Sequence, residues 1–180
     1  DMKTIGSAII MLVLTPSLFA DNGKELKLTS PDGTHEIAFY QKQVSPAVNE
    51  LCYRVDYKSQ PVVNESRAGL ELDNRIWEMA LGARNLKQPA CWMDNLEVDS
   101  VTYQPETDIT WQPLYGERSS VRDHYRTGTL YLSKKDNSGY RLNIEVRAYN
   151  EGVAFRYFFP EHPKAIFHKV VSDLTEYALP

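Results

Sequence analysis

The stretch "GTLYLSKKDNSGYRLNIEVRAYNEGVAFRYFF", residues 128–159, gives the clearest indication of the fold class. In its central part, the apolar residues at even positions from 142 to 148 alternate with polar residues at odd positions. A period of two is typical of a β-strand with one buried face. The segments "DNSG" and "NEG" supply turn residues between three such runs, which predicts an antiparallel meander. Its predicted buried face holds Leu142, Ile144, Val146, Val153, Phe155 and Tyr157, with Arg141, Asn143 and Glu145 outside.

The sequence before the meander also favours strands over helices. Runs that favour strands are "KELKLTS" (24–30), "HEIAFY" (35–40), "LCYRVDY" (51–57) and "AGLELD" (68–73), with "SPDG" as a turn and "KSQPVV" (58–63) as a connection. Ile76, Met79 and Ala80 have helical spacing, which predicts one short helix. Many short strands with turns between them predict an all-β fold, an antiparallel β-sandwich.

The amino end has the features of a secretory signal peptide. Met2 and Lys3 are followed by the apolar run "AIIMLVLTPSLFA", which ends at Ala20. This run is shorter than the roughly 20 apolar residues that a membrane span needs. We therefore predict a signal peptide at 1–20, a mature domain at 21–180 without a membrane span, and export to the periplasm or outer cell surface.

Composition and motifs exclude several classes of function. The net charge is −4, which argues against a nucleic-acid partner because such surfaces carry a clustered positive field. The chain has no Gly-rich phosphate loop, HExxH, CxxC or GxSxG motif, and its four histidines are scattered. We therefore predict no metal site in this chain. Cys52 and Cys91 form either one disulfide bridge or two separate thiols.

The stretch "WQPLYGERSSVRDHYRT", residues 111–127, concentrates aromatic and charged residues. Its aromatic rings suit stacking on a sugar or packing against another domain. Its arginines carry planar fork donors that suit carboxylates or pairs of hydroxyls. We predict a carbohydrate-binding or interdomain role for Trp111, Tyr115, Glu117, Arg118, Arg122, His124 and Tyr125.

A series of motifs resembles the amino-terminal domain of glycoside hydrolase family 97. They are "TSPDG" at 29–33, "AGLEL" at 68–72, "WQPLYGE" at 111–117, "VRDHY" at 121–125 and "RAYNEGVAFRY" at 147–157. The resemblance implies a β-sandwich of the galactose-mutarotase-like kind, placed before a catalytic (β/α)8 barrel. Members of the family are exported bacterial glycosidases, typically from Bacteroidetes, that act on α-glucosides or α-galactosides and hold calcium in the active site.

The resemblance also implies that the chain is not catalytic by itself. The family's catalytic carboxylates lie on the barrel, which is absent from this chain, so no catalytic residue is expected here. Calcium is expected in the parent enzyme and not in this fragment, and we assign no calcium role to Glu176. Where the family commonly continues "HYNE", this chain has Arg126 and Thr127. The implied role is to pack on the barrel and shape the active-site mouth, with an oligo- or polysaccharide reached through the parent enzyme.

Two other functions stay open from the residues. A free-standing carbohydrate-binding module would need an exposed aromatic platform, with Trp92, Trp111 or Tyr115 as candidates. A complete sugar epimerase would need an acid and a base that face each other across a pocket, such as His124 with Glu145 or Glu117.

Overall fold

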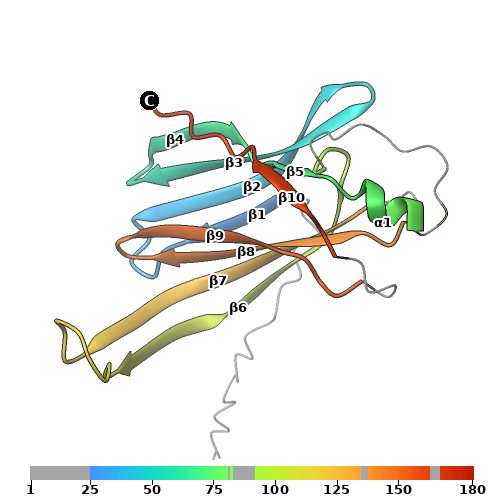
Figure 1. Cartoon of the computed structure of the whole chain (residues 1–180). Coiled ribbons are helices and arrows are strands. Elements are labelled where there is room, and N and C mark those ends of the chain that lie inside the picture. The colour runs from blue at the N-terminus through green and yellow to red at the C-terminus, as the bar shows by residue number, and fades with distance from the viewer. Residues whose placement is uncertain (1–24, 81, 83–91, 135–137, 163–166) are drawn as a thin grey trace, which may run out of the picture.

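The computed structural model describes residues 25–80, 82, 92–134, 138–162 and 167–180. It consists mainly of two four-stranded antiparallel sheets that pack face to face (Figure 1). The predicted all-β, antiparallel sandwich is confirmed. The predicted signal peptide and Cys91 lie outside the described residues.

The first sheet has its strands in chain order, and each neighbouring pair is antiparallel. The turn at "SPDG" joins the first two strands, as predicted. Leu26, Ile37 and Phe39 are fully buried on the face toward the other sheet. The strands are β1 (Glu25–Thr29), β2 (His35–Ser45), β3 (Val48–Tyr57) and β4 (Gln60–Arg67).

The second sheet contains the predicted meander. Ile144 lies between Leu130 and Tyr157 in the strand register, so all three side chains share the core face. Leu142, Ile144 and Val146 are fully buried, whereas Phe155 and Tyr157 are half-buried because they lie on the edge strand. The strands are β6 (Glu97–Trp111), β7 (Val121–Ser133), β8 (Arg141–Tyr149) and β9 (Gly152–Phe158).

Aromatic side chains join the two sheets in the core. Strand β1 lies over β7 and β8, and β2 lies over β8 and β9. The rings of Phe39 and Phe155 meet edge to face with centroids 5.1 Å apart, and Tyr53 packs 5.3 Å from Phe155. Such geometry adds attraction beyond the burial of apolar area.

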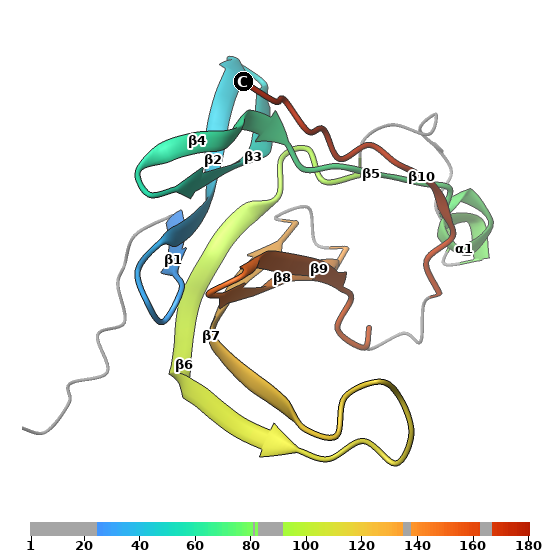
Figure 2. The same ribbon diagram turned by 90° about the vertical axis from the view of Figure 1, so that its left-hand side faces the viewer.

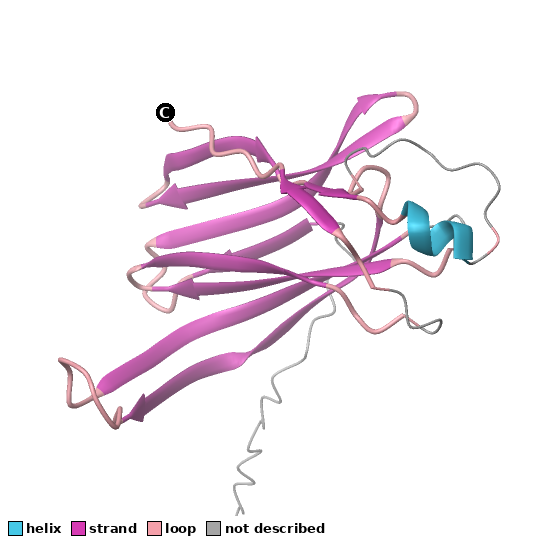
Figure 3. Cartoon of the chain, viewed as in Figure 1, coloured by secondary structure: helices cyan, strands magenta, loops and turns pink. Residues whose placement is uncertain are grey.

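A third, two-stranded sheet lies beside the sandwich. Strand β5 (Leu70–Leu72) pairs with β10 (Val170–Asp173), and the short helix α1 (Arg75–Ala80) follows β5, as the helical spacing predicted (Figure 2). Strands and the loops between them make up the rest of the described residues (Figure 3). The carboxyl-terminal segment lies alongside β4. There, the amide of Glu176 donates a hydrogen bond to the carbonyl of Arg67 at 2.9 Å.

Two segments were assigned wrongly from the sequence. The region read as a connection largely forms β4, in which Pro61 is tolerated because β4 is an edge strand of the first sheet. The region 121–127, expected to belong to a loop, is the first half of β7. This strand was hard to predict because polar residues occur on both of its faces, so apolar and polar residues do not alternate along it.

Cys52 is a buried residue of the first sheet, with Glu65, Glu50 and Lys42 among the charged groups that act on it. It lies on the opposite face of β3 from Tyr53 and Val55, as the alternation predicts. Burial raises the pKa of its thiol. The thiol is free, so Cys52 follows the unbridged alternative.

Candidate functional site

The most prominent feature outside the sandwich is a long hairpin formed by β6 and β7. Its distal half extends beyond the rest of the two sheets, and residues 112–120 close it at the tip (Figure 1). Figure 2 shows how β6 curves along its length before it reaches this tip. The strand register shifts between Gln104 and Thr107, at Pro105, which cannot donate a backbone hydrogen bond. The irregularity therefore separates a proximal part in the sandwich from a distal arm.

The tip exposes apolar side chains. Trp111 is 50% exposed, Tyr115 is 90% exposed and Leu114 is fully exposed. Gly116 has a φ of 126°, a left-handed conformation that favours glycine. Glu117 and Arg118 complete the exposed turn. Contiguous exposed apolar residues beside charges are typical of an interaction surface.

One face of the arm carries a network of ion pairs. The two carboxylate oxygens of Glu106 contact Nε2 of His124 at 2.6 Å and Nε of Arg126 at 2.9 Å. These contacts, with the His124 hydrogen bond the larger, lower the pKa of Glu106. The second ring nitrogen of His124 is buried without a partner among the residues described.

Arg126 connects the arm to the first sheet. Its Nη1 donates to Oγ1 of Thr29 at 3.2 Å, and its Nη2 donates to the carbonyl of Pro31 at 3.4 Å. Both acceptors lie where β1 turns into β2. Arg126 therefore helps to fix the direction in which the hairpin leaves the sandwich.

Tyr125 lies on the opposite face of β7 from His124. Its ring packs against Tyr149 with centroids 5.2 Å apart, and the guanidinium of Arg147 lies 4.4 Å from the Tyr125 ring centroid. Arg147 also donates to the hydroxyl of Tyr149 at 3.3 Å. This contact is the main cause of a raised Arg147 pKa.

The structure thus divides the predicted site residues into three groups. Trp111, Tyr115, Glu117 and Arg118 are at the tip, Arg122 and His124 lie on the ion-paired face, and Tyr125 lies on the other face. They do not form one pocket.

Of the predicted alternatives, Trp111 and Tyr115 have the exposure that a sugar platform needs, whereas Trp92 and the acid–base pairs do not fit their predicted roles. Trp92 is only 7% exposed and packs against Tyr140 and Phe159, so it cannot be an exposed sugar platform. The carboxylate beside His124 is Glu106, whereas Glu145 is bonded to Arg156. The acid–base pairs suggested for an epimerase are therefore not assembled.

Sequence reasoning missed three residues of the network. Glu106 and Asp108 come from β6, and Arg126 stands at a position where this chain departs from the family motif. Alternating charges of opposite sign in two successive polar segments were the available signal. That signal becomes useful only when the segments are known to pair.

The described portion of the chain has no group of three or more His, Cys, Asp or Glu residues placed to hold a metal ion. Within the same portion, no helix has the length and apolar character needed to cross a membrane.

Comparisons with known proteins identify relatives of this sandwich. Residues 28–180 match the family model described as "Glycosyl-hydrolase 97 N-terminal". A retaining alpha-galactosidase from Bacteroides thetaiotaomicron is 27% identical over 179 residues. That match covers 99% of this chain and 22% of the relative, so the chain spans about a fifth of the relative's length.

Solved structures agree with this assignment. Glycoside hydrolase family 97 enzymes from Pseudoalteromonas sp. strain K8, in complex with panose and with acarbose, each superpose with a TM-score of 0.68 at 26% identity. Each match covers 86% of this chain and 20% of the enzyme. A beta-arabinopyranosidase with a TM-score of 0.65 and 19% identity shares the fold, over 86% of this chain and 21% of its own. Sequence motifs, sheet topology and relatives agree: the chain belongs to glycoside hydrolase family 97, of which it is an N-terminal domain.

Proposed function

We propose that this chain is the accessory β-sandwich of an exported α-glycosidase and that the tip of the β6–β7 hairpin docks on the catalytic part of the same protein. The parent enzyme would hydrolyse α-glucosides or α-galactosides, and a (β/α)8 barrel would supply its catalytic carboxylates and its calcium. The sandwich would hold the barrel in place and form one side of the active-site mouth.

The observation that carries this proposal is the fully exposed Leu114 between Trp111 and Tyr115. A sugar-binding platform uses flat rings, whereas an exposed leucine gains free energy chiefly when a protein surface removes it from water. Arg118 and Glu117 are exposed beside this apolar group and provide a charged rim. An apolar centre with a polar rim is the usual composition of a protein interface.

The arm is built to present this tip in a defined direction. Arg126 bonds to the β1–β2 turn, Glu106 joins Arg126 to His124, and Arg122 is paired with Asp108 farther along. Preorganisation of an exposed element reduces the entropy that is lost on docking. The relatives are about five times longer than this chain, which supports a partner within the parent protein.

Limited trypsin digestion tests the docking. Arg118 lies in the exposed tip, and Lys58 lies in the exposed β3–β4 turn, far from it in the sequence and in a different sheet. In the isolated chain, we expect cleavage after both residues. In the parent protein, cleavage after Arg118 should be slowed at least about tenfold because the tip is covered, while cleavage after Lys58 serves as the matched control.

Mass spectrometry of the fragments gives the two rates separately. Equal protection of both sites would indicate a general effect of the longer chain. Unchanged cleavage after Arg118 in the parent protein would contradict docking through the hairpin tip.

A further inference from the structure

The outer face of the second sheet, which points away from the core, contains a polar hollow of about 470 Å³. That volume lies within the roughly 300–1,000 Å³ range of small-molecule sites. Side chains of β7 and β8 at odd positions line it, together with residues of β6 and β9. Thr129 is only 6% exposed although it lies on the outer face, and it therefore forms part of the floor.

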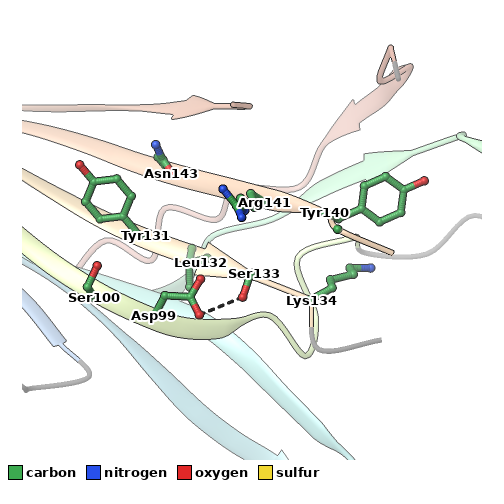
Figure 4. A pocket seen from close by; sticks show the side chains of 10 residues that line it. Asp99, Ser100, Tyr131, Leu132, Ser133, Lys134, Tyr140, Arg141 and Asn143 are labelled. Atoms are coloured by element: carbon green, nitrogen blue, oxygen red, sulfur yellow. Dashed lines mark hydrogen bonds between the residues drawn. The ribbon is translucent and has the colours of Figure 1, made fainter. Parts of the chain in front are cut away.

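A second hollow, of about 640 Å³, adjoins the first along the same face. Tyr131 and Asn143 line both, and Figure 4 shows these two side chains at one end of the second hollow. Lys134 and Tyr140 lie toward its other end (Figure 4). The two hollows together form a groove along the strands, which we call the outer groove. Its elongated shape suits an extended ligand with several units.

The middle of the outer groove offers neutral hydrogen-bonding groups that are not used within the described part of the protein. The side chains of Gln104, Thr127, Thr129 and Asn143 line it and make no hydrogen bond with another described residue. Amides and hydroxyls both donate and accept, as the hydroxyls of a saccharide do. Four such groups in one concave site therefore match a ligand that is rich in hydroxyls.

Both carboxylates that line the groove, Asp99 and Glu145, accept hydrogen bonds within the protein. Glu145 accepts from Nε of Arg156 at 2.6 Å. Figure 4 shows the bond in which Asp99 accepts from the hydroxyl of Ser133 at 2.9 Å. The guanidinium group of Arg147 offers several N–H donors. The ring of Tyr125 and the hydroxyl of Tyr149 hold this group in place. A fixed guanidinium can bind a pair of neighbouring hydroxyls. The uncharged groups in the middle of the groove thus suit a ligand rich in hydroxyls, with one strong contact at Arg147.

The outer groove differs from the surfaces that suit a protein partner. The strongly exposed apolar side chains of the hairpin tip, Trp111, Leu114 and Tyr115, do not line it. Its aromatic members Tyr125, Tyr131, Tyr149 and Phe155 are half-buried, and Tyr140 is buried. Docking of a protein would gain little from burying such a surface, whereas a saccharide could replace water there.

We propose that the outer groove is a binding site for a neutral oligosaccharide that holds a sugar chain while the parent enzyme acts on it. The identity of the sugar as an α-linked oligosaccharide rests on the proposed function. The groove itself rests on the geometry of β6–β9. Asn143, common to both hollows, and Arg147, the fixed donor, contribute the main contacts.

Calorimetric titration of the purified chain with panose tests this site. Panose should give a saturable isotherm. Asn143→Val removes the amide at nearly constant size in a strand and should weaken binding about tenfold, the effect expected for one lost hydrogen-bond partner. Arg147→Met keeps the apolar stem and should weaken it at least as much. Gln43→Val, an amide replacement at an exposed position of β2, is the matched control and should bind as the wild type does.

Circular dichroism melting verifies that each variant is folded before titration. Absence of saturable binding by the folded wild type would overturn the proposal, as would unchanged affinity in both groove variants. Loss of binding in Trp111→Ala with unchanged binding in Asn143→Val would place the sugar at the hairpin tip instead. Tighter binding of a uronate-containing trisaccharide than of panose would contradict the neutral class. Trypsin protection of Arg118 is independent of these results, so failure of the docking proposal and failure of the groove are distinguishable.

Discussion

Arg122 and Asp108 are joined across the β6–β7 hairpin by two hydrogen bonds, from Nε to Oδ1 at 2.7 Å and from Nη2 to Oδ2 at 2.6 Å. They form a diagonal pair, because Arg122 lies opposite Thr110 and Asp108 lies opposite His124. The pair lowers the pKa of Asp108. Both side chains are exposed, and exposed pairs contribute little to global stability. Their two-point geometry instead fixes how the two strands of the arm lie against each other.

Exchanging the two charges tests this role. Asp108→Arg alone places two cations together and should accelerate amide hydrogen exchange at residues 107–111 and 121–125. The double variant Asp108→Arg, Arg122→Asp should restore slow exchange, because it recreates an opposite-charge pair. Amides of β8 are the internal control and should not change. Equal exchange in the single and double variants would show that the pair does not hold the arm.

The turn between β1 and β2 should make the stability of the folded domain depend on pH in the acid range. Hydrogen bonds from Ser30, first, and then from the backbone of Thr34 lower the pKa of Asp32 from its ordinary value of 3.8 to about 2. A lowered pKa means that the folded state prefers the ionised carboxylate. Its contribution to stability is therefore present above pH 3.8 and is lost as the pH falls toward about 2.

Replacement of Asp32 by asparagine keeps an oxygen acceptor but removes this titration. Urea unfolding between pH 5 and pH 2 should show a shallower loss of stability for Asp32→Asn than for the wild type. Glu25→Gln, at an exposed position of β1, is the matched control. An identical pH dependence of Asp32→Asn and the wild type would refute the assignment.

Strand β9 offers a direct test of its two faces. Phe155 packs on Phe39 and Tyr53, whereas Phe158 is 42% exposed on the opposite face. Truncation of a fully buried phenylalanine costs roughly 3–5 kcal/mol. Because Phe155 is half-buried, we expect Phe155→Ala to lower the free energy of unfolding by about 2–3 kcal/mol. Phe158→Ala should cost less than about 1 kcal/mol, and equal losses in urea unfolding would contradict the observed register.

The meander was predictable because the alternation of apolar and polar residues along it matches the alternation of buried and exposed side chains. From Leu142 to Ala148, every apolar residue faces the core and every polar residue faces outward. Strand β6 was harder, because its distal half holds Glu106, Asp108 and Thr110 without a buried face. Its geometry depends on pairing with β7, and a single segment of sequence carries no record of its partner.

The candidate site was only partly predictable for a related physical reason. Trp92 and Trp111 are the same residue type, yet one packs among aromatics and the other lies at an exposed tip. Long-range packing decides between these environments. The outer groove was missed because Gln104, Thr127 and Asn143 are ordinary polar residues of strand faces, and only the sheet brings them together.

Thermal unfolding of the parent protein tests the central claim most directly, because docking by the hairpin tip should stabilise the whole molecule. The tip variant Leu114→Ser, Tyr115→Ser removes apolar contacts without touching the core. Val62→Ser, at a 40% exposed apolar position of β4, is the matched control. We predict that the tip variant lowers the unfolding midpoint of the parent protein by several degrees and leaves the midpoint of the isolated chain unchanged, while Val62→Ser lowers neither. A parent protein whose midpoint and hydrolysis of aryl α-glycosides are both unaffected by the tip variant would contradict the account.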